Sequence, residues 1–291
     1  MAKTNTVVEV KHEDKFTGTY FQWIKEELSG WDTFPWLLFG FGAGFELATL
    51  LLGKINSIAI ITFIGTFFGM WCTVAMSAGG YDKNGNRVRS HSINGLMGSL
   101  SVIAYIIVNY SAGHWFSIID QLFFFFLIDA PLLWTWRTWG RGKNSKMNSV
   151  LTFDEGSSIG HKIKQYFTSK WMLIIPIILV LWFALYHVGL LTNDSNPVWD
   201  ALALSIGATA SYLCFRRYTQ TYTLWLISDF VSIALWFTAL REGYSAAALP
   251  MLVMTLFYLA TAIYGKLVWK VDKPEKEVST TDDEKSNAVE A

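Results

Sequence analysis

Residues 171–191 read WMLIIPIILVLWFALYHVGLL, a run without a single Asp, Glu, Lys or Arg. A helix of about 20 apolar residues crosses the roughly 30 Å hydrocarbon core of a bilayer. The run is too long and too continuously apolar to be a strand of a membrane barrel. It therefore predicts a transmembrane helix.

The same pattern recurs along the 291-residue chain. Only 16% of the residues are charged, whereas ordinary soluble domains carry about 25%. Trp and Tyr gather near the ends of the apolar runs, as expected at membrane interfaces. We therefore predict an all-α polytopic membrane protein with eight transmembrane helices. The other seven are expected at 35–52, 55–78, 93–110, 115–136, 198–215, 222–240 and 245–268.

The 23 basic and 23 acidic residues cancel, which excludes a nucleic-acid-binding protein that depends on bulk positive charge. With eight spans, 21 of the 23 Lys and Arg residues fall on one side of the membrane. Only Lys54 and Arg241 fall on the other. Because basic residues accumulate in cytoplasmic loops, both termini are expected in the cytoplasm.

Residues 1–33 carry a shorter apolar pattern with charges between its members. This pattern is typical of an amphipathic helix, so we expect a cytoplasmic N-terminal segment that lies on the membrane surface. Its apolar residues are Phe16, Tyr20, Trp23, Ile24 and Leu28.

Six of the helices form two three-helix units that share a layout, with short outer turns at Gly113 and Gly243. One helix separates the units, so both run in the same direction, as parallel transporter repeats do. We expect a substrate site between them near the midplane. The predicted organisation is an extra transmembrane helix at 34–54, a first unit at 55–140, a cytoplasmic loop at 141–170, a linker helix at 171–197, a second unit at 198–270 and a disordered cytoplasmic tail at 271–291.

Four carboxyl groups fall within the spans, and no Lys or Arg lies at comparable depth. Each must be protonated, hydrogen-bonded, solvated or close to a cationic ligand. Ionisable residues inside a membrane are candidates for function. The four residues are Glu46, Asp120, Asp129 and Asp229.

Asp229 has the most informative neighbours, because Tyr222, Trp225, Ser232 and Trp236 share its helical face. Aromatic faces beside hydrogen-bonding groups suit a flat polar heterocycle, by stacking and, for a charged one, by cation–π attraction. An aromatic packing stripe with a polar interhelical tie would give the same pattern. A matching polar stripe in the first unit favours a central site. The candidate substrate-binding residues are Trp225, Asp229, Tyr222, Asn94, Gln121, Ser101 and Phe124.

The sequence predicts neither catalytic residues nor a cofactor or metal site. Cys72 and Cys214 both lie inside spans, as small buried apolar residues do. The five His residues show no metal-ligand spacing, and no paired catalytic groups are found. We expect a protein that is not an enzyme, whose partners are a small-molecule substrate and the lipid bilayer.

Several short motifs, taken in order over residues 55–270, resemble the PnuC family of bacterial nicotinamide riboside transporters. Three departures fall in the candidate site: Tyr222 replaces a signature Trp, Asp229 replaces an Asn, and Ser101 stands where the family often has another Asn. The motifs are Gly65-Thr66-x-x-Gly69-x-x-Cys72, Gln121-x-Phe123-Phe124-Phe125, Trp199-Asp200, Arg216-Arg217-Tyr218, Tyr222-x-x-Trp225-x-x-x-Asp229 and Gly265-x-x-x-Trp269.

The resemblance implies a SWEET-like 3+1+3 fold in the bacterial inner membrane and favours a homotrimer. It also implies facilitated diffusion of nicotinamide riboside through an occluded site, with trapping by cytoplasmic phosphorylation. The family's ligand contacts carry over to Trp225, Asp229, Asn94 and Gln121. Because of the departures, other substrates stay open: 2'-deoxynucleosides, thiamine or riboflavin, with or without proton coupling. An Asp at this place favours a cation.

Overall fold

The computed structural model describes residues 15–81, 90–139, 158–169, 171–243 and 245–268. Nearly all of these residues are helical. Within the described ranges, eight helical segments are long and apolar enough to cross a membrane. The prediction of an all-α protein with eight membrane helices is therefore confirmed.

The observed spans agree with the predicted ones to within two residues at nearly every end. Two shorter helices, α1 (Tyr20–Glu27) and α7 (Ile159–Thr168), lie outside the spans. The spans are α2 (Thr33–Leu52), α3 (Ser57–Ser77), α4 (Ile93–Ala112), the segment Trp115–Trp134, α8 (Trp171–Thr192), α9 (Pro197–Phe215), α10 (Thr221–Arg241) and α11 (Ser245–Val268).

The span Trp115–Trp134 is not a uniform helix. It consists of α5 (Trp115–Phe124), a π-helical turn η1 (Phe125–Asp129) and α6 (Ala130–Trp134). Pro131 lacks an N–H and clashes with the preceding turn of a regular helix, and a π-turn accommodates such a disruption. The turn places the Asp129 carboxyl directly against Gly98 of α4, where a Cβ atom would collide with it.

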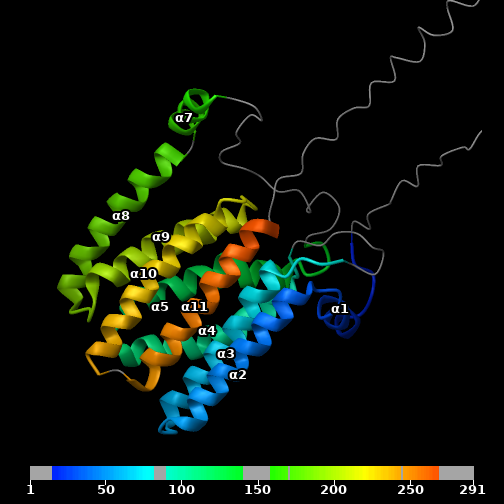
Figure 1. The fold of residues 1–291 in the computed structure, drawn as a ribbon, viewed down its shortest axis with the longest axis horizontal. Coiled ribbons are helices and arrows are strands. Elements are labelled where there is room, and N and C mark those ends of the chain that lie inside the picture. The colour runs from blue at the N-terminus through cyan, green and yellow to red at the C-terminus, as the bar shows by residue number, and fades with distance from the viewer. Residues whose placement is uncertain (1–14, 82–89, 140–157, 170, 244, 269–291) are drawn as a thin grey trace, which may run out of the picture.

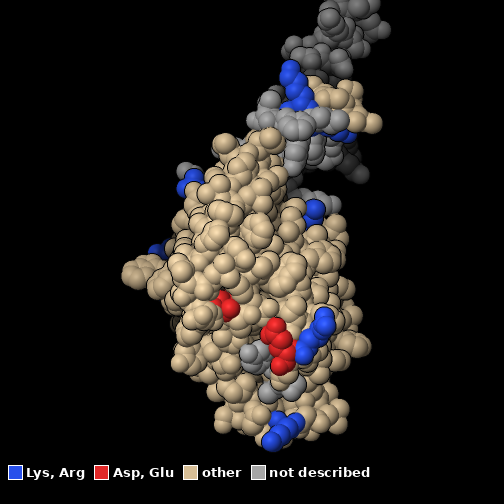
Figure 2. Space-filling view, turned by 90° about the vertical axis from the view of Figure 1, so that its left-hand side faces the viewer, with Lys and Arg blue, Asp and Glu red and all other residues tan. Residues whose placement is uncertain are grey.

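Six helices form a central bundle, in which α3 packs against α4 and α11 while α9 packs against α10 and α5. Helix α2 contacts α3 and α11 from outside, and α8 contacts α9. Figure 1 shows α2 and α8 on opposite sides of this bundle. Both present large exposed apolar side chains, as lipid-facing helices do. The face drawn in Figure 2 is largely uncharged, with a few acidic and basic side chains from its middle downward.

The N-terminal helix α1 turns its apolar face into the protein. Trp23 is fully buried, and its Nε1 donates a hydrogen bond of 3.0 Å to Ser92 Oγ. The backbone N–H of Phe16 donates to the Arg137 carbonyl at 2.7 Å. We expected this face to lie on the bilayer. An apolar stripe indicates burial but does not specify what covers it, and here the bundle does.

Some of the predicted segments fall largely outside the described residues. These include the tail at 271–291, the first 14 residues and the larger part of the loop at 141–170. Within that loop, the described residues contain α7. The predicted segment boundaries otherwise stay predictions.

Candidate substrate cavity

A cavity with about 170 Å³ of solvent-accessible volume lies inside the central bundle. Side chains from α3, α4, α5, α9, α10 and α11 line it. Among the described residues, neither α2 nor α8 contributes to the lining. The six helices that line the cavity are therefore those of the two predicted three-helix units. Its polar or aromatic lining residues are Thr73, Ser101, Tyr105, Asn109, Ser117, Asp120, Gln121, Phe124, Ser211, Tyr222, Trp225, Ser228, Asp229, Ser232, Trp236, Thr255, Tyr258 and Thr261.

Aromatic rings form one wall of this cavity. The ring of Trp225 packs against two others, that of Tyr222 with centroids 5.1 Å apart and that of Phe124 with centroids 6.4 Å apart. The hydroxyl of Tyr222 donates to the Met76 carbonyl at 3.2 Å, which fixes that ring against α3. The ring also packs against Gly265 of α11, where a Cβ atom would collide with it. This close packing holds the wall in place.

Two carboxyl groups enter the cavity, from Asp120 on α5 and Asp229 on α10. The Oδ1 of Asp120 and the Oδ2 of Asp229 are buried and have no hydrogen-bond partner in the described part of the chain. No Lys, Arg or His is found among the described residues of the lining. The cavity therefore offers two carboxyl groups without a basic partner, and such groups favour a cationic ligand when ionised and hydrogen-bond to a ligand when protonated.

A pair of tyrosine hydroxyls adds to the polar lining. The Oη atoms of Tyr105 on α4 and Tyr258 on α11 are 2.6 Å apart. They occupy the space beside Gly69 of α3, where a Cβ atom would collide with the Tyr105 hydroxyl. This hydrogen bond joins helices from the two predicted units.

Six of the seven residues predicted from the sequence line the cavity: Ser101, Gln121, Phe124, Tyr222, Trp225 and Asp229. Asn94 does not. It lies seven residues before Ser101 on α4, which corresponds to about 10 Å along the helix. Its side chain is fully buried, with no hydrogen-bond partner in the described structure. Ligand binding by all seven residues stays a prediction.

The predicted site omitted Asp120 and Tyr258. The sequence identifies Asp120 as an intramembrane carboxyl but gives no reason to place it in the candidate site. Tyr258 belongs to a stripe on α11 with Met251, Thr255 and Ala262, all of which line the cavity. Their spacing of i, i+4, i+7 and i+11 is that of one helical face. This spacing is the sequence signal that would have added Tyr258 to the predicted site.

The other two intramembrane carboxyls lie away from the cavity. Glu46 of α2 accepts a hydrogen bond of 3.2 Å from Thr66 Oγ1 on α3. Asp129 is fully buried beside Gly98. In the loop before α5, burial lowers the pKa of His114 to about 4, so its ring is neutral at physiological pH.

A bundle of membrane helices around a polar cavity with an aromatic wall is the architecture of a small-molecule membrane transporter. Residues 59–271 match the family model described as nicotinamide mononucleotide transporter. The chain belongs to this family, which is the PnuC family of the sequence analysis.

Two relatives show the extent of the similarity. A nicotinamide riboside transporter PnuC from Neisseria mucosa is 22% identical over 259 residues, which cover 85% of this chain and 84% of that protein. A crystal structure described as the vitamin B3 transporter PnuC has a TM-score of 0.62 and 18% identity, and the match covers 87% of this chain and 97% of the other. The family and both relatives are transporters, so the prediction that this protein is not an enzyme is confirmed.

Proposed function

We propose that this protein takes up nicotinamide riboside by facilitated diffusion through the central cavity, which is closed to both sides while the substrate is bound. Phosphorylation of nicotinamide riboside in the cytoplasm then traps it inside the cell. The observation that carries the proposal is an aromatic wall next to two carboxyl groups, with no basic lining residue in the described chain. Nicotinamide riboside has a flat cationic ring and ribose hydroxyls. The aromatic wall can therefore stack on the ring, and the carboxyl groups can interact with its charge and with the hydroxyls. The Neisseria mucosa relative, named for the same substrate, supports the choice.

The predicted residues that line the cavity have a role in this proposal. The rings of Trp225, Tyr222 and Phe124 stack against the pyridinium, and Asp229 offsets its charge. Gln121 and Ser101 hydrogen-bond to the carboxamide or the ribose. Asn94 contacts no ligand in this arrangement, because it lies outside the cavity lining.

The proposed architecture is a SWEET-like 3+1+3 arrangement of parallel repeats in the bacterial inner membrane. Equivalent packing of α3 on α4 and α11, and of α9 on α10 and α5, supports it. The separation of α2 and α8 from the cavity supports it as well. We place both termini in the cytoplasm from the distribution of Lys and Arg. The homotrimer stays a prediction.

The first experiment compares ligands of different charge. Purified protein is titrated with nicotinamide riboside, with its neutral dihydro form as a matched control, and with thiamine, riboflavin and thymidine. We expect the Asp229→Asn variant to bind nicotinamide riboside about 30-fold more weakly, from a loss of roughly 2 kcal/mol of charge interaction in a partly solvated cavity. Its affinity for the dihydro form should stay within threefold. Preferred binding of a deoxynucleoside or riboflavin by the wild type would refute nicotinamide riboside as the substrate.

A second experiment tests the transport mechanism. Proteoliposomes loaded with a nicotinamide riboside kinase and ATP should accumulate label, whereas empty ones should only equilibrate. An uncoupler should change neither result. Accumulation above the external concentration without the kinase, abolished by the uncoupler, would instead show proton coupling.

A further inference from the structure

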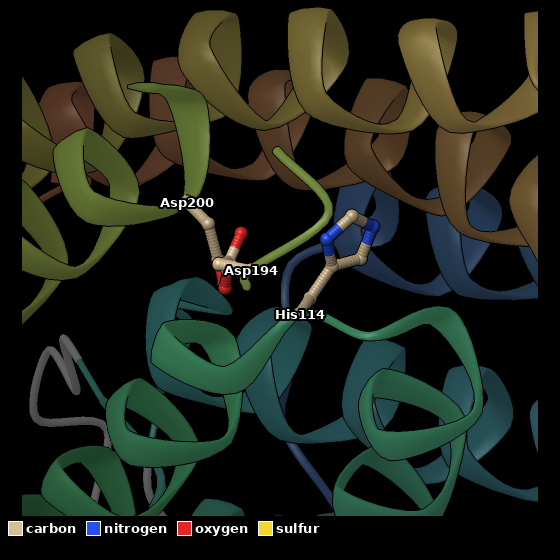
Figure 3. A group of neighbouring side chains, drawn as sticks. All are labelled: His114, Asp194 and Asp200. Carbon is tan, nitrogen blue, oxygen red and sulfur yellow. The ribbon is translucent and has the colours of Figure 1, made fainter. Parts of the chain in front are cut away.

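A group of three side chains lies where α4, α5, α8 and α9 meet, outside the central cavity lining. It consists of His114 in the α4–α5 turn, Asp194 in the α8–α9 turn and Asp200 in the first turn of α9. Each offers one ligand atom, and these atoms lie within 4.8 Å of one another. Figure 3 shows one ring nitrogen of His114 turned toward the two carboxyl groups. All three side chains are buried.

The backbone holds these groups in place. The N–H of Trp115 donates to Asp194 Oδ2 at 3.1 Å, and the N–H of Phe116 donates to Asp200 Oδ2 at 2.9 Å. The hydroxyl of Ser117 donates to Asp200 Oδ1. A carboxylate oxygen has two lone pairs, so each of these oxygens can still bind a cation. The geometry is thus preorganised by the start of α5.

The charges of the group are not balanced by the protein. Two carboxyls lie side by side in a buried place, and no Lys or Arg forms an ion pair with either of them in the described chain. Isolated charges of this kind are costly to bury, so they are found paired or bound to a metal ion. Either a cation or a shared proton must therefore offset them.

We propose that His114, Asp194 and Asp200 bind a divalent transition-metal ion of the Zn²⁺ or Mn²⁺ type. One imidazole nitrogen and two carboxylates are ligands that such ions prefer. The ligands of a tetrahedral zinc lie about 3.3 Å apart, and the ligand atoms here lie within 4.8 Å of one another, so the side chains would draw closer together around an ion. The hydroxyl of Ser195, 3.1 Å from His114 Nδ1, is a candidate fourth ligand.

A bound ion would tie two turns of the bundle to the cavity wall. It would join the start of α5 to the α8–α9 turn, which the hydroxyl of Ser195 already links to the end of α4 by donating to the Ala112 carbonyl at 3.1 Å. The ring of His114 also packs edge-on against Trp236, with centroids 5.1 Å apart, and Trp236 lines the cavity. The site is therefore placed to influence movement at that end of the cavity.

The test is metal binding by the full-length purified protein after chelation. Isothermal titration with Zn²⁺, and electron paramagnetic resonance with Mn²⁺, should show saturable binding of one ion per chain for at least one of the two metals. His114→Gln and Asp194→Asn should each weaken that binding at least tenfold. The matched control is His187→Gln, which changes an exposed histidine on α8 and should bind as the wild type does.

The outcomes separate the explanations. No stoichiometric binding of either ion by the wild type would overturn the proposal and leave a proton shared between the carboxyls. Unchanged binding by the His114 and Asp194 variants would overturn it too, because the ion would then bind elsewhere. If those variants do not fold, the Mn²⁺ spectrum of the wild type decides, since a coordinated nitrogen must appear in it. A spectrum without a coordinated nitrogen overturns the site.

Discussion

Replacing Trp23 by Ala tests whether α1 is held by the bundle or by the bilayer. The side chain of Trp23 is 0% exposed and donates its Nε1 hydrogen bond to Ser92. Removing a fully buried Trp costs about 3–5 kcal/mol. If α1 undocks as a unit, that cost raises the undocked population by roughly 150-fold to 4,000-fold, at 1.4 kcal/mol for each factor of ten.

Proteolysis measures this population. Lys25 is exposed on α1, but trypsin cuts a helix only after it opens. The rate of cleavage after Lys25, followed by mass spectrometry in nanodiscs, should rise by at least 100-fold in Trp23→Ala. The matched control is Phe21→Ala, because Phe21 is 82% exposed on the same helix. Its cleavage rate should stay within about threefold of the wild type, as is usual for surface substitutions.

The control also identifies the result that would refute the reasoning. A helix anchored in the bilayer would rely on its outward-facing aromatic residue. In that case Phe21→Ala would speed cleavage as much as Trp23→Ala or more, in nanodiscs but not in the absence of lipid. That pattern would restore the membrane-surface helix expected from the sequence.

Two further substitutions test the cavity. Tyr105→Phe removes the 2.6 Å hydrogen bond to Tyr258 and should destabilise the protein by about 1 kcal/mol, seen as a fall of roughly 2–4 °C in thermal unfolding; an unchanged unfolding temperature would show that the two hydroxyls are not bonded. Gly207→Ala places a Cβ against the Asp120 carboxyl and should cost about 1–3 kcal/mol while weakening ligand binding. Gly40→Ala on α2 meets no atom within 4 Å and should be neutral or slightly stabilising, so equal effects of the two alanines would contradict the predicted clash.

The sequence was sufficient for the spans and for one wall of the site. Continuous apolar runs reveal membrane helices because their length is fixed by the bilayer rather than by tertiary contacts. On α10, helical periodicity alone places Tyr222, Trp225 and Asp229 on one face, and the structure turns that face to the cavity. The same reasoning placed Asn94 in the site, but periodicity gives the direction of a side chain and says nothing of its depth along the bundle.

Contacts between distant segments could not be predicted in this way. His114 and Asp200 come together only because the start of α5 packs against the start of α9. A loop and a linker helix separate the two residues in the sequence. They therefore do not form a short sequence motif with the spacing of metal ligands. Likewise, the apolar stripe containing Trp23 is visible in the sequence, but its partner Ser92 lies 69 residues away.

The four intramembrane carboxyls determine how the proposed function is best tested. Substrates that differ in charge test it more sharply than substrates that differ in shape. Glu46 and Asp129 are enclosed between helices, where a neutral form can be retained throughout transport. Asp120 and Asp229 face the cavity and have unpartnered oxygens in the described structure. No basic side chain is found among the described lining residues to balance these carboxylates. The compensating positive charge must therefore come from the substrate or from protons. A pyridinium offsets the charge of one carboxylate and leaves one carboxyl to be protonated, whereas a neutral nucleoside requires both carboxyls to be protonated. The neutral dihydro control separates these two cases.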